Sequence, residues 1–161
     1  MAALVLAGGA VLGCTKPADE PESPAESAVR AAVGVLQEAF RERDAGRIWE
    51  NLDAKSRSEA DQAAITVQAK YRQADAAGKT DLETVYGLSG SELASLTGPN
   101  VLKTKPFLKK YRELPESVIA KIDVVGKQAT VSYVEPDGDR KKFTLMLRDG
   151  KWKAVLALPK E

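Results

Sequence analysis

The chain of 161 residues has no histidine and a single cysteine, Cys14. Without histidine it offers no imidazole base, no Ser-His-Asp or Cys-His arrangement, and no histidine-based zinc site. One cysteine also excludes a disulfide within the chain. Any catalytic chemistry would have to come from Asp, Glu, Lys, Tyr, Ser or Thr, and no pattern among these residues predicts a bound metal or cofactor.

An excess of charge of one sign is also missing. The 24 basic and 23 acidic side chains leave a formal net charge of +1, and 43% of the residues are hydrophobic. This balance is typical of a globular chain and gives no indication of nucleic-acid binding. The length favours one folded domain, which we place at residues 24–161.

Long hydrophobic runs are absent too. The N-terminal run, Ala2–Leu12, is the length of the apolar part of a signal peptide and well short of the roughly 20 residues that a transmembrane helix needs. It ends in Val11-Leu12-Gly13-Cys14, which resembles the lipobox of bacterial lipoproteins. The resemblance implies cleavage before Cys14, a diacylglycerol on its sulfur and, usually, an acyl chain on its new amino group. An ordinary signal peptide or a chance match is the alternative.

The lipobox resemblance divides the N-terminal region into a signal peptide, residues 1–13, and a lipidated tether, residues 14–23. The tether is rich in proline and acidic residues and has no large apolar side chain, as expected of a solvated linker. Thr15 stands where an aspartate often signals retention in the inner membrane. We therefore expect an outer-membrane anchor, with the domain facing the periplasm.

Helix-capping patterns predict a helical region after the tether. Ser23-Pro24-Ala25-Glu26 is a capping box with proline at the first helical position. Asp44 is expected to cap a second short helix, and Ser58 a third that runs to about residue 77. Thr80 and Ser89, each followed three residues later by glutamate, predict two further helices. Residues 106–114 can form another.

Three turn sequences predict an antiparallel meander over residues 118–158. Gly126-Lys127 fits a type II′ turn, Pro136-Asp137-Gly138 a type I turn followed by a left-handed glycine, and Asp149-Gly150 a type I′ turn. Each turn fixes a register between its two strands. The predicted pairs include Ala120 with Tyr133, Ile122 with Val131, Val131 with Phe143, Phe143 with Leu156 and Leu147 with Trp152.

These registers gather apolar residues on one face of the predicted sheet. The opposite face is polar except for four positions, Ile119, Val134, Met146 and Val155. A sheet with one apolar face needs a cover, and only the upstream helices can supply it. We therefore predict an α+β fold with N-terminal helices packed on one face of a curved four-stranded antiparallel meander. The predicted inner face is Val118, Ala120, Ile122, Val124, Ala129, Val131, Tyr133, Phe143, Leu145, Leu147, Trp152, Leu156 and Leu158.

This order of elements resembles the nuclear transport factor 2-like superfamily, an α+β roll with a conical pocket. The matching sequences are Asp44-Ala45-Gly46-Arg47-Ile48-Trp49 in the helical part and Asp149-Gly150-Lys151-Trp152-Lys153 at the last turn. Residues 80–114 depart from the superfamily, which commonly has a helix-strand segment where we expect helices. The resemblance implies a pocket, with the candidate lining residues Trp49, Tyr86, Tyr133, Phe143 and Trp152.

The superfamily includes enzymes such as ketosteroid isomerase and scytalone dehydratase beside many binding domains. The isomerase type uses a carboxylate base and acidic donors in an apolar cavity. Tyr133 is the best candidate donor here, but it has no recognisable carboxylate partner. The predicted register puts Asp123 on the polar face, away from the pocket. A core tyrosine is the simpler interpretation.

A basic cluster near the predicted helix 106–114 contains Lys105, Lys109 and Arg112. It could hold an anion or lie against acidic lipid headgroups, although a solvated helix face is the simpler interpretation.

We expect a non-enzymatic, lipid-anchored cell-envelope domain that binds a small molecule, a peptide or a protein partner. The alternative is an isomerase- or dehydratase-like enzyme that uses Tyr and Asp in an apolar pocket. A cavity filled by the chain's own side chains, and a homodimer through the apolar residues of the outer sheet face, are further hypotheses.

Overall fold

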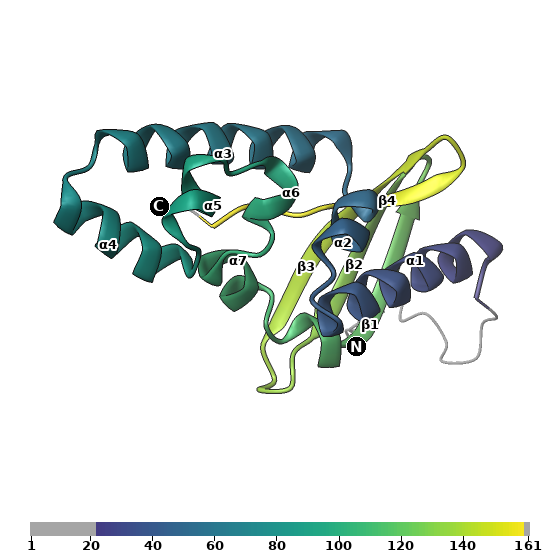
Figure 1. Ribbon diagram of the computed structural model, residues 1–161. Helices are drawn as coiled ribbons and strands as arrows, with labels where there is room; N and C mark the ends of the chain where they lie inside the picture. Colours follow the sequence, from purple (N-terminus) through teal and green to yellow (C-terminus); the bar gives the residue numbers. More distant parts are fainter. Residues whose placement is uncertain (1–21, 160–161) are drawn as a thin grey trace, which may run out of the picture.

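A computed structural model describes residues 22–159 of the chain. Seven α-helices and a short 3-10 helix precede a four-stranded antiparallel sheet of order β1-β2-β3-β4 (Figure 1). The predicted α+β fold with an antiparallel meander is confirmed. The proposed signal peptide, Cys14 and most of the tether lie outside the described residues. None of the described helices is long and apolar enough to span a membrane.

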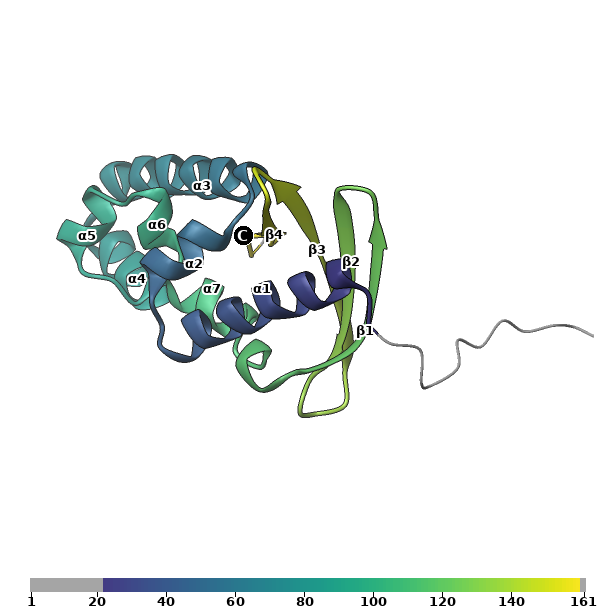
Figure 2. The same cartoon turned by 90° about the vertical axis from the view of Figure 1, so that its right-hand side faces the viewer.

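The first two helices begin where the sequence predicts. α1 (Pro24–Arg41) opens with the capping box, in which the Ser23 hydroxyl accepts from the Glu26 amide and the Glu26 carboxylate accepts from the Ser23 amide. Asp44 caps α2 (Ala45–Asn51). α1 then lies along one face of the sheet (Figure 2), where its stripe of buried apolar residues packs on the strands.

Two predicted helix starts are wrong. α3 (Ala54–Gln73) is capped by Asp53 rather than by Ser58. α4 (Ala76–Tyr86) is capped by Asp75, so Thr80 lies inside that helix. In both cases an aspartate upstream competes for the capping role, and aspartate caps at least as well as serine or threonine.

The remaining elements are short helices and then the strands. The predicted capping box at Ser89 opens α5 (Gly90–Ala94). The segment predicted as one helix over residues 106–114 instead forms a short α-helix, which ends at Lys110, and a separate 3-10 helix, which begins at Leu114. The other elements are α6 (Gly98–Val101), α7 (Lys105–Lys110), η1 (Leu114–Glu116), β1 (Val118–Val125), β2 (Gln128–Val134), β3 (Arg140–Arg148) and β4 (Lys151–Val155).

The three turns have the backbone conformations that their sequences predict. Gly126 and Gly138 have φ values of +58° and +92°, and Asp149 and Gly150 both have positive φ, as a type I′ turn requires. The registers that these turns set are confirmed in the middle of the sheet. The observed pairs include Ile122 with Val131, Val131 with Phe143 and Leu147 with Trp152.

One predicted pair is wrong because β1 contains a bulge. The register shifts between Ile119 and Lys121, so Tyr133 pairs with Ile119 instead of Ala120. A bulge adds one residue to one strand, and this reverses the faces of the residues beyond it. Ile119 therefore packs against the core rather than on the outer face, and Val118 is 69% exposed.

A second predicted pair is missing at the end of β4. The last paired residue of β4 is Val155, opposite Thr144, and Leu156 does not pair with Phe143. The buried Ser56 of α3 binds Leu156 instead: its hydroxyl donates to the Leu156 carbonyl at 3.0 Å and accepts from the Leu156 amide at 2.8 Å. Because both backbone groups of Leu156 are used by α3, the chain turns away from β3 at this residue.

Asp53 adds a second link between α3 and the last strands. Its amide donates to the Ala154 carbonyl at 2.8 Å, and its buried carboxylate accepts from Lys55 N and from Arg148 Nε at 2.9 Å. Burial alone would raise the pKa of Asp53, but the hydrogen bonds from Arg148 and from backbone amides outweigh it and hold the pKa below its ordinary value. Asp53 thus stays ionised and caps α3.

The buried hydrophobic residues form two clusters. The larger one joins α1 and α2 to the inner face of the sheet and includes the stacked rings of Phe40 and Phe107, 5.8 Å apart. The smaller one lies among the helices α3, α5 and α6. Trp49 and Leu158 pack against both clusters. The helices from α3 to α7, which we call the helical half, therefore have a core of their own. This half is attached to the sheet through α2, the start of α3 and the C-terminal segment.

We predict that Ser56→Ala lowers the free energy of unfolding by about 1–3 kcal/mol, because it leaves the buried amide and carbonyl of Leu156 without their partner. Urea unfolding followed by circular dichroism measures the change. Ser58→Ala, an exposed position on the same helix, is the matched control and should cost less than about 0.5 kcal/mol. Equal losses in the two variants would contradict the assignment of the contact to Ser56.

Candidate functional site

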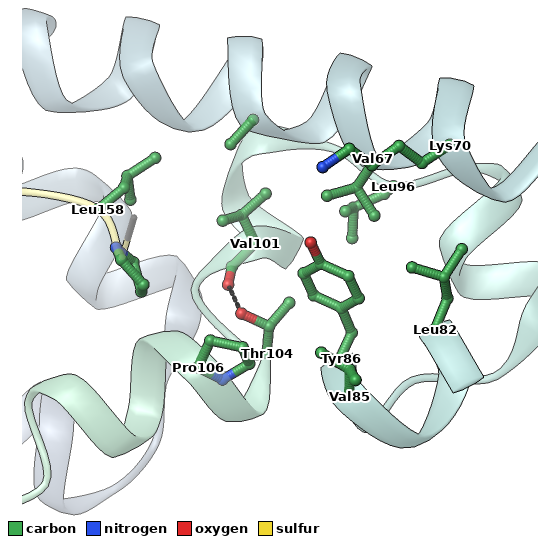
Figure 3. A pocket seen from close by; sticks show the side chains of 12 residues that line it. Val67, Lys70, Leu82, Val85, Tyr86, Leu96, Val101, Thr104, Pro106 and Leu158 are labelled. Carbon is green, nitrogen blue, oxygen red and sulfur yellow. Dashed lines mark hydrogen bonds between the residues drawn. The ribbon is translucent and has the colours of Figure 1, made fainter. Parts of the chain in front are cut away.

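An apolar cavity of about 390 Å³ lies in the helical half of the protein (Figure 3). Its walls come from α3, α4, the α5–α6 region, the start of α7 and the C-terminal segment. The volume falls in the range of small-molecule sites, which starts at about 300 Å³. The lining residues are Ala63, Val67, Lys70, Leu82, Val85, Tyr86, Leu96, Val101, Thr104, Pro106, Leu158 and Pro159.

One wall is a single face of α3. Ala63, Val67 and Lys70 follow one another at the spacing that puts residues on the same side of a helix. Leu96 and Val101 are buried beside this face, in the same smaller hydrophobic cluster as Val67. This wall is rigid, since it is continuous with the core of the helical half.

The other wall is α4, which contributes Leu82, Val85 and Tyr86. No residue of α4 is buried, and Val85 is 56% exposed. In Figure 3 the Tyr86 ring stands in the cavity with its hydroxyl directed toward α3. α4 therefore covers the cavity with apolar side chains without being enclosed by the rest of the protein.

Polar contacts hold α4 in place near its C-terminal end. The Tyr71 hydroxyl donates to the Glu83 carboxylate at 2.8 Å, and Lys105 Nζ donates to the Thr84 carbonyl at 3.1 Å. The helix ends at Gly87, whose φ of +68° is the left-handed conformation that favours glycine. A Cβ at Gly87 would also come within 2.6 Å of the Lys105 side chain. α4 is thus attached by these polar contacts and by Leu82 and Tyr86, which are partly buried and pack against the smaller cluster.

The lining of the cavity contains few polar side chains. Thr104 is buried, and its hydroxyl donates to the Val101 carbonyl at 2.7 Å, so this group is satisfied within the chain. Lys70 and Tyr86 are the other polar side chains among the described lining residues, and none of these residues is a carboxylate. The lining therefore holds no acid–base pair of the isomerase type.

The structure distributes the five candidate pocket residues over several places. Tyr86 lines the apolar cavity. Tyr133 and Phe143 make an edge-on ring contact at 5.6 Å beside a different cleft at the end of the sheet. Trp152 is buried in the larger cluster. Trp49, at the end of α2, lies between the two clusters with the Arg57 guanidinium 5.6 Å from its ring.

The expected cone over the inner face of the sheet is filled by side chains. The buried residues of α1, together with Phe107 and Tyr111, pack against the inward residues of the strands. Phe107 has no exposed surface, and Tyr111 is buried and donates its hydroxyl to the Ala157 carbonyl at 2.7 Å. Phe107 and Tyr111 belong to the helical region in which the sequence departs from the superfamily pattern, so an open pocket forms elsewhere.

Two of the three residues in the predicted basic cluster have partners within the chain. Lys105 holds the Thr84 carbonyl, as described above, and Arg112 pairs with Glu113 at 2.7 Å. Lys109 is exposed on α7. These contacts account for Lys105 and Arg112 without an external anion.

Sequence reasoning missed most of the cavity lining. Several lining residues have the helical spacing of ordinary packing positions. Their spacing does not distinguish an interface filled by side chains from one that leaves a cavity. They are Ala63, Val67, Leu82 and Val85. The sequence of α4 contains the one usable signal. A helix with few apolar residues between polar turns is not expected to be buried in a core, so a loosely packed wall could have been expected there.

No protein-family model, curated protein or solved structure matches the chain. Its function is therefore argued from its own residues.

We predict that the backbone amides of α4 exchange with deuterium faster than those in the middle of α3. No side chain of α4 is itself fully buried, whereas α3 contributes buried residues to the smaller cluster, so local opening of α4 costs less free energy than unfolding α3. Hydrogen exchange followed by mass spectrometry under native conditions measures both helices in one sample. Equal protection of α3 and α4 would show instead that the two helices unfold as one cooperative unit.

Proposed function

We propose that the protein is a lipid-anchored binding domain of the bacterial cell envelope, without enzymatic activity, whose apolar cavity takes a small hydrophobic molecule. The observation that carries the proposal is the cavity of about 390 Å³ lined almost entirely by apolar side chains. A hydrophobic ligand that fills such a cavity gains about 25 cal/mol for each Å² of apolar surface removed from water.

The structure of the cavity suggests how a ligand enters. α4 forms one wall and has no fully buried residue, and it is held by two polar contacts and by the partly buried Leu82 and Tyr86. Moving this helix outward would open the cavity while leaving the smaller cluster of α3, α5 and α6 intact. The site then combines a rigid wall with a movable one, as ligand sites with lids do.

The N-terminal sequence supports a position at a membrane. Val11-Leu12-Gly13-Cys14 resembles a lipobox, and residues 14–23 are long enough to hold the domain within roughly 30 Å of the bilayer when extended. Several acyl chains, at about 0.8 kcal/mol per buried methylene, would keep it there. A domain held at this distance could take apolar molecules that partition into the bilayer. The outer membrane remains our proposal for the site of the anchor.

We favour a small molecule over a peptide or protein partner because the cavity volume of about 390 Å³ lies in the range of small-molecule sites. We also propose membership of the nuclear transport factor 2-like superfamily, on the basis of α1, α2 and the meander.

A homodimer through the outer sheet face would have to use Met146 and Val155, both partly buried, because Ile119 packs on the core.

We predict that labelled palmitate is incorporated into the protein in a bacterial host and that Cys14→Ser abolishes the labelling, since the thioether to the lipid cannot form. Immunoblotting confirms that both proteins are made, and fluorography measures the label. An unlabelled wild-type protein, or a labelled variant, would remove the anchor from the proposal.

We predict that the full chain carrying Cys14→Ser binds the apolar dye N-phenyl-1-naphthylamine and that adding Ala63→Trp lowers the affinity at least about ten-fold, because the indole fills the cavity. Fluorescence titration measures the binding. Ala69→Trp, an exposed position on the same helix, is the matched control and should bind like the parent. If both tryptophan variants bind equally well, the dye does not occupy this cavity.

A further inference from the structure

A second cleft, of about 430 Å³, lies at the end of the sheet where β4 leaves β3. It is separate from the apolar cavity and shares no lining residue with it. It exists because Ser56 draws Leu156 away from β3, so that residues 140–143 of β3 have no paired strand on that side in the described part of the chain. Nothing in the proposed function uses this cleft.

Tyr133 lines this cleft, and its hydroxyl has no hydrogen-bond partner within residues 22–159. Tyr133 is only 6% exposed, and no described residue forms a hydrogen bond with its hydroxyl. Every fully enclosed side-chain nitrogen or oxygen in the described part of the chain has a partner, so this hydroxyl must reach the open space of the cleft that Tyr133 lines. Because it reaches this open space, the hydroxyl can donate to water or to a ligand that enters the cleft.

The surroundings of Tyr133 favour an anion. Lys110, Lys141 and Lys142 line the cleft. The Lys110 ammonium donates to the Leu158 carbonyl at 2.9 Å and lies 5.8 Å from the centre of the Tyr111 ring, which leaves Lys141 and Lys142 as the lysines for a ligand. The buried carboxylate of Glu135 forms an ion pair with Lys141. This contact, together with the negative charge of the exposed Asp139, raises the pKa of Lys141. Burial, and then the negative charge of Glu135, raise the pKa of Tyr133. At neutral pH the hydroxyl therefore keeps its proton and can donate a hydrogen bond to an anion.

The floor of the cleft is apolar. Phe143 is 9% exposed and touches the Tyr133 ring edge-on, and the Tyr111 ring lines the same space. The Tyr111 hydroxyl is already bound to the Ala157 carbonyl, so Tyr111 presents its ring rather than a free polar group. A ligand that satisfies the whole cleft needs a charged group for the lysines and Tyr133, and an apolar body for the two rings.

We propose that this cleft binds a small organic carboxylate. Its carboxylate is held by the Tyr133 hydroxyl and the ammonium groups of Lys141 and Lys142, and its apolar body lies against Phe143 and Tyr111. Hydrogen bonds from charged or acidic donors to a carboxylate are stronger than those between neutral groups. The partly open edge of β3 gives the ligand access from solvent.

The four tyrosines of the chain allow the site to be located directly. In the full chain with Cys14→Ser, labelling with 3-fluorotyrosine gives one fluorine resonance for each tyrosine, assigned by single Tyr→Phe variants. Tyr111 and Tyr133 report on the cleft, whereas Tyr71 and Tyr86 report on the helical half. Benzoate is the probe, benzyl alcohol is its uncharged counterpart, and inorganic phosphate is an anion without an apolar body.

Benzoate should shift the Tyr111 and Tyr133 resonances in a saturable way and leave Tyr71 unchanged, while benzyl alcohol and phosphate bind more weakly. Tyr133→Phe removes only the hydroxyl and should weaken benzoate binding about ten-fold, followed at Tyr111, which is the loss expected for one hydrogen bond to a charged group. Tyr71→Phe removes the same atom from the helical half and is the matched control, with unchanged affinity.

Three results would overturn the proposal. They are the absence of saturable shifts at Tyr111 and Tyr133, equal benzoate affinity in Tyr133→Phe and the parent, and equal affinity for benzoate and benzyl alcohol. Shifts confined to Tyr86 would place the probe in the apolar cavity and also exclude this site. Because the two sites have different reporters, failure here leaves the proposed function standing.

Discussion

The contact between the start of α3 and the end of β4 is the constraint on which the rest of the structure depends. Ser56 uses its hydroxyl to bind both backbone groups of Leu156, and Asp53 binds Ala154, Arg148 and its own helix. Ser56, Asp53, Ala154 and Leu156 are buried, where an unmade hydrogen bond costs more than a made one gains. The contact therefore fixes the angle at which the helical half joins the sheet.

Both candidate sites follow from that junction. Because Leu156 is held by α3, the C-terminal segment leaves β3, and the cleft beside Tyr133 stays open. The same segment then continues into the helical half, where Leu158 and Pro159 line the apolar cavity. The two sites differ in chemistry because their walls differ. Helices with alanine, valine and leucine surround the cavity, while lysines of β3 and α7 surround the cleft.

Local sequence patterns predicted the elements that depend on short-range physics. The hairpin registers next to the three turns were correct, and so were the capping boxes at Ser23 and Ser89 and the cap at Asp44, since each involves residues close together in the chain. The predicted caps at Ser58 and Thr80 were wrong because an aspartate upstream, Asp53 or Asp75, caps the helix instead. The bulge in β1 was not predicted because no residue type marks it. The one extra residue reverses the faces of Val118 and Ile119.

The sequence by itself determined the α+β class, the meander, the lack of histidine chemistry and the lipobox resemblance at Cys14, because composition and local turn or cap geometry suffice for these. Only the tertiary structure decided where space remains. The inner face of the sheet is filled by α1, Phe107 and Tyr111, while gaps remain under α4 and beside Tyr133. A cavity is a mismatch between surfaces brought together from distant parts of the chain, and no local pattern records such a mismatch.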